Sequence, residues 1–401
     1  MIGRLRLAAS APALALALVP SAQAEPALPP PYAGAYQPHG VDEQGLWRQM
    51  DEEERRFAES DMIIRDEALN TYVRKVLCDT VGQDRCGATR VYIVRVPWFN
   101  ASMSPNGLMQ VYSGLLLRVH SEAELGAVLG HEFGHFEARH SLEELKARRS
   151  GTDVLSWALV LANLAPSYDM VRAYRDLQLT IIGNFYRFNR DQEREADGLG
   201  IRYLNSSMLR PQAAAQVWER LMAEFAADAR AKGLKKPRFD RIPFYSTHPP
   251  EAERAATLAL LARPDAAQRD DGAARYRAAL APWIPQLLDD QIKLNDFGAS
   301  EFLIQSLAEG GWTAPLWHAR GELHRMRGAP RDLANAATFY GEAVALDPNH
   351  AEAHRGLGLS LLKTGQPGPG QQALRRYLTL KPDAPDAKLI GMMIPQEVPA
   401  P

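Results

Sequence analysis

Two histidines and a glutamate at positions 131–135 have the types and spacing of a metal site with a general base. His131 and His135 lie four residues apart in the segment HEFGH. On a helix this spacing leaves about 40° between them, so both imidazoles can meet one metal ion. Glu132 is rotated by about 100° from His131, where its carboxylate can reach a water without being a ligand. The pattern predicts amide hydrolysis, with zinc acidifying the water and Glu132 accepting its proton.

The residues around HEFGH favour a metal site over two surface histidines. They are largely apolar and include Leu125, Val128, Leu129 and Phe133. Histidines and a glutamate on such a buried helix would be costly without a metal. Calcium prefers oxygen ligands and iron a different triad, so we expect one zinc ion per chain.

A third ligand must come from elsewhere in the chain. The metzincin pattern requires Gly and His downstream of the motif, but Ala138 and Ser141 occupy those positions. His140 is out of phase with the two ligand histidines, so we predict that it lies on the surface.

The segment DQEREAD, residues 191–197, offers a glutamate on a second helix. Glu193 and Asp197 share a face at i and i+4, whereas Glu195 points away from them. Glu193 can therefore bind the metal while Asp197 orients a ligand imidazole through its free N–H.

Several elements must position these side chains. Ser121 and Glu124 form a capping-box pattern that opens a helix over 122–148. Residues 91–96 and 108–113 are predicted strands, and 191–205 a further helix. An exposed edge of the strand at 108–113 could pair with an extended substrate through backbone hydrogen bonds.

The N-terminal residues predict export. Residues 1–24 have the charged, apolar and small-residue regions of a signal peptide, and residues 25–45 are predicted to form a Pro-rich linker. The apolar stretch 154–164 is too short to span a bilayer, and we expect a buried helix there; contact with a membrane or a client is the alternative. An oxidising compartment would make a local disulfide between Cys78 and Cys86 plausible. The net charge of -2 argues against a nucleic-acid partner.

The C-terminal third predicts a helical repeat. Leu346-Asp347-Pro348 recurs as Leu380-Lys381-Pro382 after 34 residues, which is the tetratricopeptide period. Trp317-x-x-Arg320-Gly321 and His354-x-x-Leu357-Gly358 lie 37 residues apart, which implies a small insertion around 328–332. A plain helical bundle is the alternative.

HEFGH, the later ExxAD and the segment STHPP at 246–250 together resemble the gluzincin family that includes the CAAX prenyl protease, HtpX and periplasmic BepA. With the signal peptide and the repeats, the chain is most similar to BepA-type proteases. The resemblance implies that His131, His135 and Glu193 are zinc ligands, that Glu132 is the base and that Asp197 supports a ligand. It also places His248 and Arg254 at the active-site rim, where His248 either stabilises the oxyanion with Arg254 or masks the zinc as a fourth ligand.

The expected fold is mainly α with a small β-sheet: a zincin-like α+β metallopeptidase domain over 46–260, followed by an all-α tetratricopeptide domain over 261–398. The resemblance implies a periplasmic zinc endopeptidase with chaperone activity, acting on misfolded or stalled envelope proteins. Its repeats would dock clients or the outer-membrane assembly machinery. The alternative is a non-catalytic tetratricopeptide chaperone or scaffold with a masked or structural zinc site. No membrane-spanning segment is expected in the mature chain.

Overall fold

The computed structural model describes residues 30–33, 36–149, 190–235, 237, 239, 251–328 and 330–394. The predicted signal peptide, the apolar stretch at 154–164 and His248 lie outside these residues. The described chain is mainly helical with one small sheet, as predicted. Among the described residues, no helix combines the length and apolarity that crossing a bilayer requires.

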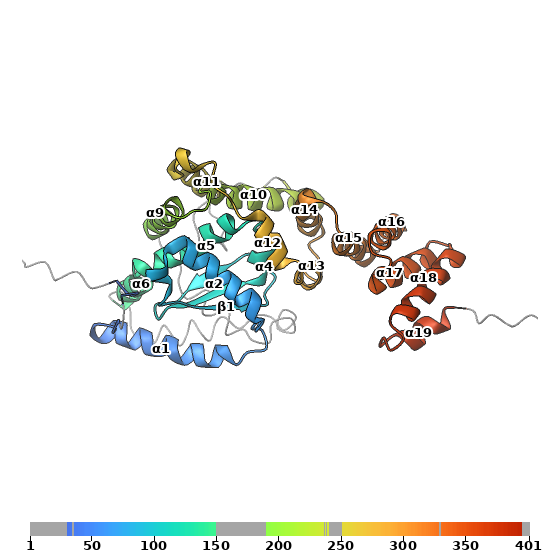
Figure 1. Cartoon of the computed structure of the whole chain (residues 1–401), viewed down its shortest axis with the longest axis horizontal. Helices are drawn as coiled ribbons and strands as arrows, with labels where there is room; N and C mark the ends of the chain where they lie inside the picture. Colours follow the sequence, from blue (N-terminus) through green and yellow to red (C-terminus); the bar gives the residue numbers. More distant parts are fainter. Residues whose placement is uncertain are drawn as a thin grey trace, which may run out of the picture.

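The first part of the chain carries the sheet and the helices around it (Figure 1). Its strands are β1 (Arg90–Val94), β2 (Ala101–Met103) and β3 (Leu108–Tyr112). Its helices are α1 (Gly40–Ala58), α2 (Glu67–Val81), α3 (Gln83–Cys86), α4 (Ser113–Arg118), α5 (Glu122–Glu137), α6 (His140–Arg149), α9 (Arg190–Ser206), α10 (Ala213–Ala231) and α11 (Glu251–Leu261). Helix α1 thus begins inside the range predicted as linker.

The C-terminal part is helical throughout its described length. It consists of α12 (Ala273–Leu280), α13 (Ile284–Ile292), α14 (Phe297–Leu307), α15 (Ala314–Arg327), α16 (Pro330–Leu346), α17 (Ala351–Lys363), α18 (Pro367–Leu380) and α19 (Ala387–Met392). Helices α15–α19 extend away from the sheet in Figure 1.

The sheet has the order β1-β3-β2, with β3 parallel to β1 and antiparallel to β2. Side chains alternate between its faces, as the two-residue period of a strand requires. Val94 and Leu108 pack with Phe57 of α1, whereas Ile93 and Met109 join the core that contains α2 and α5. The prediction that 108–113 offers an exposed edge is wrong, because β3 is central and buried throughout. The short strand β2, which the sequence did not reveal, is an edge instead.

Helix α5 begins with the predicted N-cap. Ser121 Oγ accepts a hydrogen bond from Glu124 N–H at 3.1 Å, and Glu124 Oε2 accepts one from His120 N–H at 2.7 Å. The helix ends at Glu137, so the prediction of one helix over 122–148 is wrong. Arg139 adopts the left-handed conformation with φ 57°, and a separate helix, α6, begins at His140.

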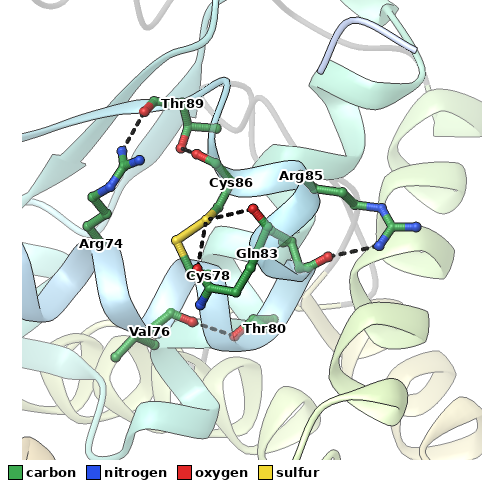
Figure 2. Close-up of a disulfide and its surroundings, with 9 residues drawn as sticks. Arg74, Val76, Cys78, Thr80, Gln83, Arg85, Cys86 and Thr89 are labelled. Carbon is green, nitrogen blue, oxygen red and sulfur yellow. Dashed lines mark hydrogen bonds between the residues drawn. A yellow bond between two sulfur atoms is a disulfide. The ribbon is translucent and has the colours of Figure 1, made fainter. Parts of the chain in front are cut away.

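The predicted disulfide is present between Cys78 in the last turn of α2 and Cys86 in α3 (Figure 2). Nearby, Arg74 Nη1 donates a hydrogen bond to the carbonyl of Thr89 at 2.6 Å, just before β1. The disulfide and this hydrogen bond therefore stabilise the connection between α2 and β1. Helix α2 packs in turn against α5.

The hydrophobic core continues from the sheet and α5 into the C-terminal helices. Leu288 of α13 and Ile304 of α14 belong to the same buried cluster as Leu125 of α5. One ion pair and one hydrogen bond cross the same contact: Arg95 Nε lies 2.6 Å from Asp290 Oδ2, and Arg118 Nη2 donates to Gln291 Oε1 at 2.9 Å. The domain boundary predicted between residues 260 and 261 thus falls within a continuous core.

Helices α15–α16 and α17–α18 form two similar pairs. A Cβ on Gly321 would lie 2.6 Å from the Tyr340 ring, and a Cβ on Gly358 would lie 2.6 Å from Leu374. Tyr340 and Leu374 are 34 residues apart, whereas the two glycines are 37 apart. The first pair therefore has three more residues between its contact positions, and these lie in α16, which has 17 residues against 14 in α18. Helix α16 begins within the range 328–332 where the sequence predicted an insertion.

Candidate metal centre

Helix α5 brings the two motif histidines together. Their Nε2 atoms are 3.1 Å apart and their ring planes are nearly perpendicular, at 83°. Both side chains are buried, with His131 5% and His135 1% exposed. Because Leu129 and Phe133 fill the core side of α5, the helix cannot rotate without exposing them.

Helix α9 adds Glu193, which is 1% exposed. Its Oε2 lies 3.5 Å from His131 Nε2, and its Oε1 lies 3.6 Å from His135 Nε2. The two helices cross closely because glycines line the contact: a Cβ on Gly200 would be 3.0 Å from His131 N, and one on Gly134 would be 3.1 Å from Ala196 O. Within the described chain these three side chains form the group able to hold a metal ion.

The donor set fits zinc. A tetrahedral ion with bonds of about 2.0–2.1 Å places its ligand atoms roughly 3.3 Å apart, close to the separations of 3.1–3.6 Å observed here. Two imidazoles and one carboxylate, with one position left open, are a donor set of catalytic zinc sites.

The electrostatics of the site also favour a cation. Glu132, Glu193 and Asp197 are buried together, and Arg254 supplies one positive charge among them. Burial and Arg254 act to lower the pKa of His131, but its hydrogen bonds with Asp197 and Glu193 outweigh them and raise that pKa to about 9. The carboxylates thus stabilise added positive charge at the imidazole, which a metal ion would also supply.

Asp197 supports His131, as the i, i+4 spacing on α9 predicted. Its Oδ1 lies 2.9 Å from His131 Nδ1, which leaves Nε2 directed toward the other ligand atoms. Burial acts to raise the pKa of Asp197, but Arg254 and His131 lower it to about 2. Asp197 is therefore a carboxylate at neutral pH.

Arg254 lies inside the site, at 2% exposure, whereas the family resemblance placed it at the rim. Its Nε donates to Asp197 Oδ2 at 3.0 Å, and its Nη2 lies 3.0 Å from His131 Nδ1. The guanidinium also stacks at 3.9 Å on the ring of Trp218 from α10. Arg254 thus holds Asp197 against His131 and links α11 to α10.

Glu132 is buried at 6% exposure, directly after His131 on α5. His248, the remaining predicted site residue, belongs to the residues that the structure does not describe. Of the predicted set, the structure therefore brings together His131, Glu132, His135, Glu193, Asp197 and Arg254.

His140 was missed, and the prediction that it lies on the surface is wrong. It is 1% exposed, and its Nδ1 lies 2.9 Å from His135 Nδ1. The prediction assumed an unbroken helix, but the left-handed turn at Arg139 changes the helical phase. A histidine five residues after the motif was the only signal in the sequence.

Residues 64–262 match the family model of Peptidase family M48. The chain is 32% identical over 164 residues to the mitochondrial metalloendopeptidase OMA1 of Schizosaccharomyces pombe, covering 41% of this chain and 44% of that protein. It is 30% identical over 175 residues to a putative beta-barrel assembly-enhancing protease of Vibrio cholerae, covering 41% and 35%. It is 32% identical over 162 residues to the metalloprotease YcaL of Escherichia coli, covering 39% and 55%.

The matched segment spans about a third to just over half of the length of these relatives. It contains HEFGH, Glu193, Asp197 and Arg254, so the family match and the buried cluster coincide. Through residues 64–262, this chain belongs to Peptidase family M48.

Proposed function

We propose that this protein is a zinc-dependent endopeptidase. The observation that carries the proposal is the convergence of His131, His135 and Glu193 beside the buried carboxylate of Glu132. When bound, zinc supplies a Lewis acid that makes water reactive near neutral pH. Glu132 accepts the proton of the attacking water and passes it to the leaving amine, while Asp197 and Arg254 hold His131 in place.

The edge strand β2 provides a place for an extended substrate. Asn100 O accepts from Tyr112 N at 3.1 Å, and Ser104 N donates to Leu108 O at 2.8 Å, so alternate residues of this segment face β3. The backbone groups of Ala101 and Met103 therefore point to the other side of the strand. Helix α5 packs against β2, so a peptide paired there would lie near the metal site.

We further propose a periplasmic location and a role in removing misfolded or stalled envelope proteins. The support is the predicted signal peptide and the similarity to a relative named as a beta-barrel assembly-enhancing protease. The equivalent helix pairs α15–α16 and α17–α18 support a tetratricopeptide domain that docks clients or assembly machinery and has chaperone activity. Binding through the backbone of β2 suits unfolded clients of many sequences.

Zinc content and casein cleavage of the wild type and Glu132→Gln test the catalytic proposal. We expect one zinc per chain in both proteins and a loss of cleavage of about 10²-fold or more in the variant. Glu219→Gln, an exposed change on α10, is the control and should cleave normally. Equal cleavage by Glu132→Gln and the wild type would contradict the proposal. No cleavage by the wild type would instead favour a non-catalytic scaffold with a masked or structural zinc.

A client trap then tests the cellular role. The Glu132→Gln protein should retain bound clients that the wild type degrades, and envelope proteins should predominate among them. Retention of mainly other classes of protein would argue against the proposed substrates.

A further inference from the structure

A second layer of contacts lies behind His135. His140 packs edge-on against His135, with ring centroids 5.0 Å apart and the planes at 73°. The Nδ1 atoms of the two rings are 2.9 Å apart, and His140 Nε2 lies 3.3 Å from Glu195 Oε2. Three side chains thus form a continuous line from the metal cluster to the protein surface, where Glu195 is 61% exposed.

The proton positions along this line follow from the geometry. His135 directs Nε2 toward His131 and Glu193, so Nε2 is the atom that would bind the metal. A neutral imidazole that uses Nε2 as a ligand carries its proton on Nδ1. That proton can be donated to His140 Nδ1 only when His140 carries its own proton on Nε2, which then donates to Glu195.

We propose that His140 is a positioning residue for the metal ligand His135, and that Glu195 fixes the tautomer of His140. The inference rests on the proposed zinc site. It gives His135 an outer partner equivalent to the one that Asp197 provides for His131. Without it, the His135 ring could rotate about its side-chain bonds or carry its proton on Nε2 instead of Nδ1, and either change removes a metal ligand.

A neutral imidazole suits this position better than a carboxylate. Glu132, Glu193 and Asp197 already place three carboxylates in the buried site, and a fourth beside His135 would be repelled by them. His140 accepts the hydrogen bond without adding charge. The negative charge of Glu195 remains at the surface, where water solvates it.

The turn at Arg139 delivers His140 to this place. Arg139 Nη2 donates to Tyr36 Oη at 2.8 Å, and its Nε lies 3.4 Å from Glu43 Oε1 on α1. The guanidinium also lies 5.1 Å from the centre of the Tyr36 ring. Residues near the N-terminus therefore hold the left-handed turn that His140 requires.

Zinc affinity, measured by competition with a chelator, tests the proposal through His140→Leu and His140→Asn. Loss of an outer partner typically weakens metal binding by about 10–100-fold, and we expect this loss in His140→Leu. The amide oxygen of Asn can take the place of Nδ1 as acceptor, so His140→Asn should stay within a few-fold of the wild type. Glu195→Ala should lose less than His140→Leu, because His140 itself remains.

The outcomes separate this inference from the proposed function. Zinc binding by the wild type together with unchanged affinity in His140→Leu would overturn the inference alone. Equal weakening in His140→Leu and His140→Asn, with equal loss of thermal stability in the zinc-free proteins, would also overturn it, because packing would then explain the effect. Absence of zinc binding in the wild type would overturn both proposals.

Discussion

Glu193 and Glu195 lie two residues apart on α9, so their side chains point about 200° apart around the helix. Glu193 is buried among the ligand histidines, whereas Glu195 is exposed and contacts His140. We expect Glu193→Gln to lose zinc on dialysis, because a neutral amide replaces the anionic ligand. Glu195→Gln should keep its zinc, since the amide oxygen can still accept from His140. Zinc loss in the Glu195 variant alone would make Glu193 the wrong third ligand.

The role of His248 in the active site stays a prediction, because this residue lies outside the described residues. Zinc at rest prefers four ligands, and a masking histidine would hold the enzyme inactive until substrate displaces it. We expect His248→Ala to keep zinc and to raise basal casein hydrolysis. An oxyanion role would instead lower activity by roughly 10²-fold, and cleavage well below that of the wild type would refute the masking role.

At the scale of elements, the crossing of α5 and α9 sets the distance between the histidines and Glu193. A Cβ on Gly200 would lie 3.0 Å from His131 N and 3.1 Å from His131 Cα, both backbone atoms of α5. Gly200→Ala should therefore push the helices apart by a few tenths of an ångström. We expect weaker zinc binding and a loss of about 1–3 kcal/mol in the free energy of unfolding.

Gly198→Ala is the matched control for that change. It lies on the same helix, and its added Cβ meets no atom within 4 Å. Helix propensity favours alanine over glycine by up to about 1 kcal/mol, so this variant should be as stable as the wild type or slightly more stable. Equal zinc affinity in the two alanine variants would show that the helix separation does not control the site.

At the scale of the whole molecule, the family-matched segment shares its core with the helices that follow. Leu288 and Ile304 are fully buried in the cluster that also contains Leu125. A chain that ends at Ala262 should therefore expose a large apolar surface, bind a hydrophobic dye and aggregate. A chain that ends at Gly328 retains α12–α15 and should keep the association state of the full chain, with one zinc. A folded, zinc-loaded chain ending at Ala262 would contradict this expectation.

Local patterns in the sequence determined the parts of the site that lie within single helices. The spacing of His131 and His135, the i, i+4 relation of Glu193 and Asp197 and the N-cap at Ser121 depend on helical periodicity alone. Cys78 and Cys86 form the predicted disulfide because they are only eight residues apart, which limits the distance between them. The family motifs then identified the metallopeptidase.

Tertiary structure decided whatever depends on the relative placement of elements. Strand β3 is central because β2 pairs with its second edge. The three residues of β2 are too few to show the alternating pattern of a strand in the sequence. The depth of Arg254 arises from the packing of α11 against α10, where Asp197 and Trp218 surround its charge. His140 reaches His135 because Arg139 adopts a left-handed backbone conformation. Contacts between Arg139 and residues far away in the sequence stabilise this conformation. A helical phase cannot be extended across such a break, so the sequence alone could not place His140.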